Sequence, residues 1–232
     1  MNWDQVVKKV SPHVVKIETP SGHGTGFLLL HNDNHTWCGI ATAEHVVAYA
    51  DDWQQPIRIR PTLGDHLFLR PENRVIYRDL KTDSAVVLFF KGDLQLPEIP
   101  IALTPMGQFI EIGAEVGWLG FPAVAPNNLC FFSGNISARQ EFRNAYLIDG
   151  VSINGVSGGP VIHLTGTEGI QIVGTVSSYS ANRATGEALP GLAIAQDVSH
   201  FHDVANHIHS IDEANRRKAE FEALQNLPSD QA

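Results

Sequence analysis

The sequence contains very few cysteines. Only Cys38 and Cys130 occur among its 232 residues, whereas small secreted domains are usually held together by several disulfides. A catalytic cysteine needs a histidine partner, and the sequence shows none for Cys130. We therefore interpret both thiols as small apolar core residues and expect a reducing compartment.

Basic residues are also scarce, and long hydrophobic runs are missing. Lys and Arg number 16 against 25 Asp and Glu, which gives a formal net charge of -9. This balance argues against a nucleic acid partner, because phosphate binding needs a basic surface. No apolar run approaches the length of a membrane span. The opening MNWDQVVKKV lacks the apolar region of a secretory signal. We expect a cytoplasmic protein without a membrane partner.

What the sequence does contain is a succession of short β-like runs. From Val14 to about Ala195, about a dozen segments rich in Val, Ile and Phe are bounded by Gly, Pro, Asn and Asp. Helical patterns do not alternate with them, so a parallel βαβ sheet is not supported. The spacing predicts an all-β barrel or sandwich. The runs include VVKIE (14–18), GFLLL (26–30), RVIYR (74–78), SAVVLFF (84–90), LCFFSGNIS (129–137) and IQIVGTVSS (170–178).

Helical patterns are confined to the two ends of the chain. Residues 2–10 predict a short helix before the first strand. The stretch that begins near residue 199 carries apolar residues at helical spacing and ends in a charged segment. Residues 101–113 show no strand pattern until their end, so we expect them to connect two β lobes.

The segment NGVSGGPVI (154–162) places one serine, Ser157, among glycines. The letters GVSGG match G-x-S-x-G, the nucleophile elbow of α/β-hydrolases, which needs a helix directly after the serine and an acid and a histidine further downstream. Acids and a histidine do lie downstream, but the sequence from Pro160 onward predicts a strand. The elbow is therefore disfavoured.

The other possibility places the histidine and the acid upstream of the serine. ATAEHVV puts His45 at a turn just past a β-run, and KTDSAVVLF puts Asp83 at the start of an apolar strand. The resulting order of histidine, acid and serine differs from that of subtilisin, where the acid comes first. Three further acids lie nearby and do not immediately precede the strand: Asp51, Asp52 and Asp79.

Taken together, nine stretches resemble the trypsin/chymotrypsin-fold serine proteases, and most of all their bacterial HtrA-like branch. They are VVKKVSPHVVKIE, GHGTGFLL, ATAEHVV, TDSAVVLF, VGWLGFP, GNIS, NGVSGGPVI, IVGTVSS and GLAIAQDV. The resemblance implies an all-β fold of two six-stranded antiparallel barrels in one trypsin-like peptidase unit, residues 1–226. We place the N-terminal barrel at about 12–103, the C-terminal barrel at about 110–198 and a helix at about 199–226. We find no PDZ-like module, so the resemblance stops short of the full HtrA architecture.

The resemblance also implies peptide hydrolysis in the cleft between the barrels, through an acyl-enzyme intermediate. A serine hydroxyl is a poor nucleophile unless a base lies within hydrogen-bond reach. His45 would be the base for Ser157, and Asp83 would orient the imidazole and stabilise its protonated form. The backbone N–H groups of Gly155 and Ser157 would form the oxyanion hole. We expect a protein or peptide substrate, no cofactor and no metal.

Two positions depart from the secreted trypsin pattern. Val156 stands where those enzymes carry an aspartate that pairs with a new N-terminus, so we expect no activation by N-terminal cleavage. Val151 stands at the inferred floor of the specificity pocket, which predicts an apolar P1 residue instead of Arg or Lys, provided that Glu187 stays out of the pocket. The other expected substrate-binding residues are Asn154 at the rim and a wall that pairs with the substrate backbone: Thr175, Val176, Ser177 and Ser178.

The C-terminal helix raises a metal hypothesis through four histidines: His200, His202, His207 and His209. None of their pairs has the i, i+4 spacing of a close zinc pair, and a solvated helical face is the preferred interpretation. Two alternative functions stay open for the chain. It could be a protease-fold binding or scaffold protein with little or conditional activity, with a regulatory protein partner, or an esterase-type acyl hydrolase.

Overall fold

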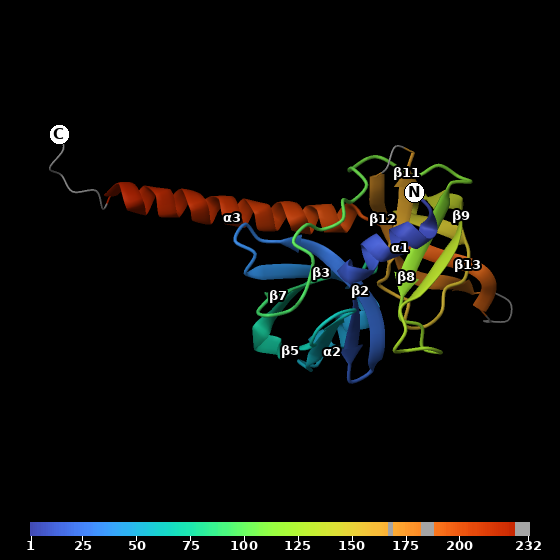
Figure 1. Ribbon diagram of the computed structural model, residues 1–232, viewed down its shortest axis with the longest axis horizontal. Coiled ribbons are helices and arrows are strands. Elements are labelled where there is room, and N and C mark those ends of the chain that lie inside the picture. The colour runs from blue at the N-terminus through green and yellow to red at the C-terminus, as the bar shows by residue number, and fades with distance from the viewer. Residues whose placement is uncertain (167–168, 182–187, 226–232) are drawn as a thin grey trace.

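A computed structural model describes residues 1–166, 169–181 and 188–225. Its N-terminal lobe is a curled sheet of seven antiparallel strands in the order β5-β4-β1-β2-β3-β7-β6 (Figure 1). The lobe is built from β1 (Val14–Thr19), β2 (Gly22–His31), β3 (Trp37–Ala43), α2 (Glu44–Asp52), β4 (Ile57–Pro61), β5 (Leu67–Leu69), β6 (Arg74–Asp79) and β7 (Ser84–Phe90). Apolar residues on its concave side, among them Ile17, Ile40 and Phe89, are fully buried.

The C-terminal lobe is a closed barrel of six strands in the order β10-β13-β12-β11-β8-β9. Its strands are β8 (Glu115–Gly120), β9 (Cys130–Gln140), β10 (Ala145–Asp149), β11 (Pro160–Thr165), β12 (Gly169–Ala181) and β13 (Ala188–Asp197). Trp118, Tyr146 and Val161 belong to the apolar cluster that fills it. The described part of the chain also contains three short 3-10 turns, at Ser11–His13, Pro71–Asn73 and Glu141–Arg143.

The predicted chymotrypsin-like all-β fold is confirmed, with one difference in the first lobe. Seven strands form it instead of six, and among the described residues the edge strands β5 and β6 do not pair into a closed barrel. The Arg74 side chain of β6 bridges this opening. It donates to the carbonyls of Leu69 (3.1 Å), Ala50 (3.1 Å) and Gln55 (2.7 Å). Hydrogen bonds from this side chain thus satisfy backbone carbonyls at the opening between β5 and β6, where backbone hydrogen bonds between these strands would close a barrel.

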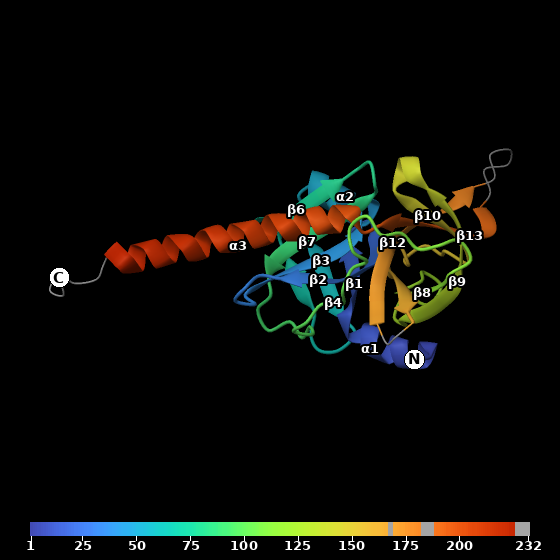
Figure 2. The same cartoon turned by 90° about the horizontal axis from the view of Figure 1, so that it is seen from above.

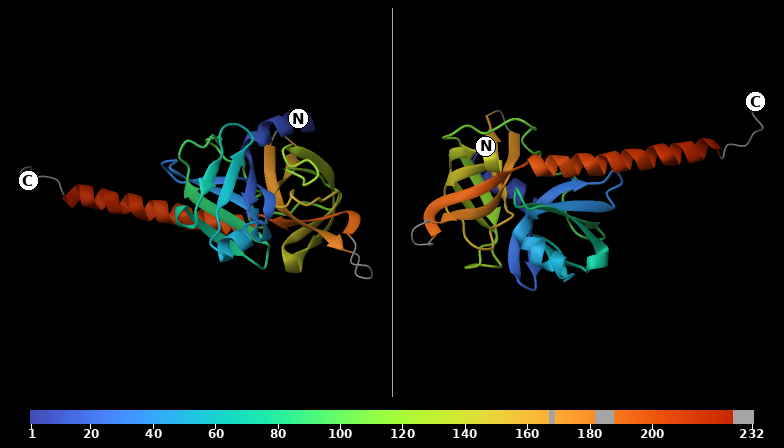
Figure 3. Two further views of the ribbon diagram at one scale, coloured as in Figure 1. Left: turned by 90° about the horizontal axis from the view of Figure 1, so that it is seen from below. Right: turned by 180° about the vertical axis from the view of Figure 1, so that it is seen from behind.

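Helices lie at the two ends of the chain, as the sequence predicts, but helix α2 inside the first lobe is not expected from it. The sequence predicts a turn at His45, whereas the chain there continues as a nine-residue helix because Val47 and Ala50 pack into the core of the lobe. Helix α1 (Trp3–Val10) starts with a capping box between Asn2 and Gln5. Helix α3 (Ser199–Gln225) packs its first turns on the N-terminal sheet through Phe201 and Val204, whereas its later part projects away from both lobes (Figures 1 and 2). Figure 3 shows the same projection from two further sides. No helix within the described residues is long and apolar enough to cross a membrane.

The segment 101–113 runs between the lobes, as expected. It pairs with β12 through a single parallel bridge between Leu103 and Ile172. The candidate site lies between the two lobes, because residues of both line its cavity.

Candidate active site

Two neighbouring strands of the first lobe bring His45 and Asp83 together. Strands β3 and β7 pair in a register that places Ala43 opposite Ser84. The residues just beyond this pair are therefore neighbours, and the Glu44 N–H donates to the Asp83 carbonyl at 3.0 Å. His45 occupies the first turn of α2, and its own N–H donates to Asp83 Oδ1 at 3.0 Å.

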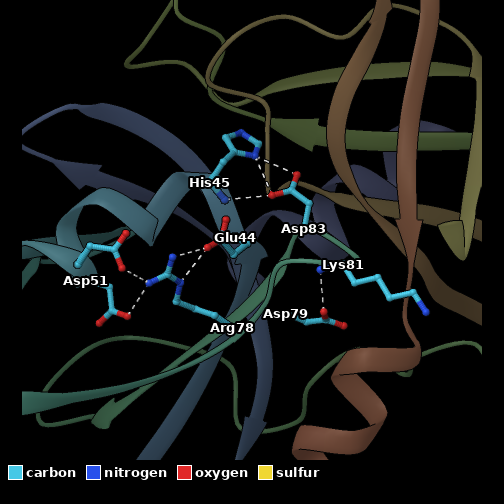
Figure 4. A network of polar contacts seen from close by, with 8 residues as sticks. Glu44, His45, Asp51, Arg78, Asp79, Lys81 and Asp83 are labelled. Atoms are coloured by element: carbon cyan, nitrogen blue, oxygen red, sulfur yellow. Dashed lines mark hydrogen bonds and ion pairs between the residues drawn. The ribbon is translucent and has the colours of Figure 1, made fainter.

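The imidazole and the carboxylate face each other directly (Figure 4). His45 Nδ1 lies 2.9 Å from Asp83 Oδ2 and 3.0 Å from Oδ1. The hydrogen bond to Asp83 raises the pKa of His45 above its ordinary value despite the opposing effect of burial, and the charges of Asp83 and Glu44 add to the increase. Asp83 adopts a left-handed backbone with φ +47°, which aspartate tolerates better than most residues. The second lobe also reaches this carboxylate, because the Ser177 hydroxyl donates to Asp83 Oδ2.

The three other acids considered from the sequence have different partners. Asp51 and Asp52 bind Arg78 Nη1 at 3.1 and 2.5 Å, as Figure 4 shows for Asp51. Asp79 accepts from the Lys81 N–H and the Thr82 hydroxyl, both at 2.9 Å. Among the described residues, Asp83 alone of the four acids hydrogen-bonds to His45.

The second lobe supplies Ser157 from the loop between β10 and β11. Gly155 and Gly158 in this loop have φ +91° and +86°, a region that favours glycine. The backbone N–H groups of Gly155 and Ser157 donate to no backbone carbonyl within the described residues. The Ser157 hydroxyl donates to the Ser177 carbonyl at 3.3 Å. Among the described residues, no hydrogen bond joins this hydroxyl to His45.

Thr25 of β2 ties the serine loop to the first lobe. Its hydroxyl donates to the Gly155 carbonyl at 2.8 Å and accepts from the Phe121 N–H at 3.0 Å. Its backbone N–H donates to the Ser157 carbonyl at 2.8 Å. The Thr42 hydroxyl in turn donates to the Thr25 carbonyl at 2.7 Å. Thr25 lies in the stretch GHGTGFLL, but no pattern in the sequence predicts this role for it.

A cavity of about 210 Å³ lies between the two lobes and is lined by His45, Asn154, Gly155 and Ser157, together with His23 and the β1–β2 turn. Three of the predicted site residues therefore share one cavity with Asn154, the expected rim residue. Val151 is 49% exposed and does not line this cavity. Val156 is fully buried in the core of the second lobe. Glu187 lies outside the described residues.

The predicted substrate-binding strand belongs to β12. Thr175 pairs with Pro160 on one side and with Gln196 on the other. The pairing with β13 shifts between Val176 and Ser178, so Ser177 lies at a bulge, a feature that re-aims side chains. Strand β11 starts at Pro160, which pairs with Thr175. Strand β12 therefore extends beyond the start of β11, and its edge after Val176 faces Ser157.

A partly buried ion network, which no local sequence pattern predicts, supports the helix that carries His45. Arg78 of β6 donates to Glu44 Oε1 from Nε at 2.8 Å and from Nη2 at 2.5 Å, besides its bonds to Asp51 and Asp52 (Figure 4). Glu44 directly precedes His45, and the two aspartates end α2. One guanidinium thus contacts both ends of this short helix.

The C-terminal histidines have separate neighbours. His200 Nδ1 lies 4.0 Å from Asp79 Oδ2, and the ring of His207 packs on Tyr77 with centroids 5.8 Å apart. His202 Nε2 lies 2.8 Å from the Thr104 carbonyl. Within the described ranges no group of three or more potential metal ligands gathers.

Comparisons with known proteins agree with this fold. The family description "trypsin-like peptidase domain" matches residues 24–168. The serine endoprotease of Yersinia pestis is similar in structure, with a TM-score of 0.64 at 19% identity over 90% of this chain and 67% of that one. The inactive form of the Rv3671c protease of Mycobacterium tuberculosis gives a TM-score of 0.61 at 22% identity over 88% and 92%. A serine-to-alanine mutant of Rv3671c gives 0.60 at 21% over 88% and 90%. The comparison with curated proteins gave no match.

Proposed function

The chain belongs to the trypsin-like peptidase family, and we propose that it is a serine endopeptidase in which Ser157 is the nucleophile, His45 the general base and Asp83 the orienting acid. The observation that carries the proposal is the His45–Asp83 pair, with His45 Nδ1 at 2.9 Å from Oδ2, beside a cavity that Ser157 also lines. Such a pair leaves Nε2 of the imidazole to act on the serine.

In the proposed reaction, the Ser157 hydroxyl attacks the scissile carbonyl carbon while its proton passes to His45 Nε2. The tetrahedral intermediate then collapses, the C–N bond breaks and the leaving amine takes the proton from His45. Water repeats the two steps on the acyl-enzyme and releases the acid. Asp83 orients the imidazole and stabilises the imidazolium, an assignment supported by its hydrogen bond to His45 and by the raised pKa of His45.

The proposed oxyanion hole consists of the N–H groups of Gly155 and Ser157. Each such donor contributes roughly 3–4 kcal/mol to the stability of the intermediate in comparable enzymes. Two observations support the assignment. Neither N–H donates to a backbone carbonyl within the described residues, and the positive φ of Gly155 sets its peptide in a conformation that residues with a Cβ avoid.

For specificity we propose an apolar P1 residue beside Val151, with the acyl half of the substrate added as a strand along 175–178 and Asn154 at the rim. Support comes from the edge of β12 that extends past β11 and from the exposed apolar side chain of Val151. We also propose that no new N-terminus is needed for activity, because the buried, apolar Val156 offers no charge for it to pair with.

One observation favours a second candidate, a protein with little or conditional activity. The Ser157 hydroxyl bonds to Ser177 and not to His45 within the described residues. Catalytic hydrogen bonds are often long or misaligned before substrate binds, so a rotation of the Ser157 side chain on binding would convert this resting arrangement into the reactive one.

The two candidates are separated by a fluorophosphonate probe, which reacts with an activated serine. We expect labelling of Ser157 in the wild-type protein and none in Ser157→Ala, whereas Ser210→Ala, a change on exposed helix α3, keeps the label. Peptide turnover in Ser157→Ala should fall by far more than about 100-fold. Absence of labelling in a folded wild-type protein would contradict the proposal and leave the binding role.

The proposed cytoplasmic location rests on the cysteines. Cys38 and Cys130 are both free, and burial raises the pKa of the Cys38 thiol to about 12. Such a thiol is unreactive at neutral pH, in line with a structural role.

A further inference from the structure

The outward face of strands β1 and β4 carries a ladder of charges beside the candidate active site. In the antiparallel register Lys16 lies opposite Arg60 and Glu18 lies opposite Arg58. Residues directly opposite in such a pair point to the same face. The intervening Ile17 and Ile59 are fully buried in the core, so all four charged side chains lie on the other face.

This ladder holds three cations and one carboxylate. Glu18 Oε1 binds Lys16 Nζ at 3.0 Å and Oε2 lies 3.4 Å from Arg58 Nη1. Arg60 takes part in no ion pair with the described residues and is exposed. Burial alone would raise the pKa of Glu18, but the hydrogen bond and charge of Lys16 and the charges of the two arginines lower it, so Glu18 is ionised at neutral pH. Three positive charges less one negative charge leave +2 on this face, in a chain of net charge -9.

Two hollows open along the ladder, and the first of them adjoins the cavity beside Ser157. The first, of about 370 Å³, is lined by Glu18, Arg58, Pro56 and Phe68, and it shares Thr19, Gly22 and His23 with the Ser157 cavity.

The second hollow, of about 420 Å³, is lined by Lys16 and Arg60 and by the loop after β8, including Phe121. It shares no lining residue with the first hollow or the Ser157 cavity, but its Phe121 carbonyl lies 3.0 Å from Nε2 of His23, which lines both. The two hollows thus follow one another along the cationic ladder, and together we call them the groove.

The groove lies on the side of Ser157 opposite to the proposed strand-pairing edge. Ser177 on β12 accepts the Ser157 hydroxyl, whereas the β1–β2 turn lines the cavity from the first lobe. A peptide whose acyl half pairs with 175–178 would direct its leaving half across this turn toward Arg58 and Arg60.

We infer that this groove binds the leaving half of the substrate and selects peptides with acidic residues after the scissile bond. The inference rests on the proposed peptidase function. The overall negative charge of the protein repels acidic peptides at long range, so a preference for them has to arise from a local cationic surface. Arg58 would bind an acidic side chain in the first hollow, and Arg60 with the nearly buried Lys16 would do so in the second.

The test uses internally quenched peptides with one acyl half and three leaving halves, which carry two acidic residues, their amide isosteres Asn and Gln, or two lysines. We expect kcat/KM for the acidic peptide to exceed that of the amide peptide by about threefold to tenfold at low ionic strength, and the ratio to fall as salt is added. The double variant Arg58→Gln/Arg60→Gln should abolish this ratio. Arg143→Gln, which removes an exposed arginine from the Glu141–Arg143 turn, should keep it.

Three results would overturn the inference: equal rates for the acidic and amide peptides, an unchanged ratio in the double variant, or the same preference when the acids are moved to the acyl half. If the protein cleaves none of the peptides, the dissociation constants of the same set for Ser157→Ala, measured by fluorescence anisotropy, decide in the same way. Fluorophosphonate labelling of Ser157 reports separately on the peptidase proposal, so failure of one is distinguishable from failure of the other.

Discussion

Alanine at Gly155 should disable the active site, whereas alanine at Gly107 should not. Both glycines have positive φ, +91° and +79°, so alanine costs each of them about 1–2 kcal/mol in backbone conformation. Their surroundings differ. A Cβ on Gly155 would overlap the Phe121 carbonyl and lie 2.6 Å from His23 Nε2, whereas a Cβ on Gly107 would meet nothing within 4 Å. Only Gly155→Ala therefore forces the backbone of the serine loop to move.

The displaced peptide carries the proposed Gly155 oxyanion donor, and loss of one such donor reduces kcat by about 100-fold to 1,000-fold. Urea unfolding of both variants measures the shared backbone cost, and turnover of a peptide or an activated ester measures the loss of catalysis. We expect Gly107→Ala to lose about 1–2 kcal/mol with unchanged kcat, and Gly155→Ala to lose more stability together with at least about 100-fold in kcat. Turnover of Gly155→Ala within about tenfold of the wild type would refute the reasoning.

Three further changes, the last with a matched control, test the proposed acid, the support of helix α2 and the packing of helix α3. Asp83→Asn should cut turnover by about 10⁴-fold. In the proposed mechanism His45 acts in its neutral form, so activity is lost as pH falls through the pKa of His45. The hydrogen bond to Asp83 raises this pKa. Its removal in Asp83→Asn should therefore shift the acid limb of the residual pH–rate profile to lower pH. Arg78→Met should lower the free energy of unfolding by about 3 kcal/mol, measured in urea, because it leaves a buried carboxylate unpaired. Phe201→Ala, at a fully buried position, should cost about 3–5 kcal/mol in the same assay, whereas Phe221→Ala, at a position 61% exposed, should change it by less than about 0.5 kcal/mol.

The strand pattern and the candidate site residues could be predicted because their signals are local. A β-run before His45, an apolar strand after Asp83 and glycines around Ser157 each lie within a few residues of the side chain concerned. The strand pattern alone leaves a barrel or a sandwich open, and the two-barrel fold is predicted from the resemblance of nine stretches to a known family. In the structure, strands β3 and β7 pair directly and place His45 beside Asp83.

The supporting contacts could not be predicted in this way, because each joins segments far apart in the sequence. Thr25 bonds to Gly155, 130 positions away, and Ser177 to Asp83, 94 positions away. Strand β5 has only three residues, Leu67–Leu69, too few for an alternating pattern. The buried Arg74 bridges the opening between β5 and β6 by donating to three backbone carbonyls. No pattern in the sequence predicts which carbonyls these are.

The hydrogen bonds of Thr25 couple the docking of the two lobes to the conformation of the loop that carries Ser157. If the lobes separate, the carbonyl partners of Thr25 at Gly155 and Ser157 are lost together, and Ser157 moves away from His45 and Asp83 at the same time. A ligand that contacts both lobes should consequently stabilise the folded state of the whole chain. At a free concentration of 100 times its dissociation constant it adds about 2.7 kcal/mol to the folded state. Both lobes should then melt at one higher temperature, since neither can release the ligand's contacts without the other.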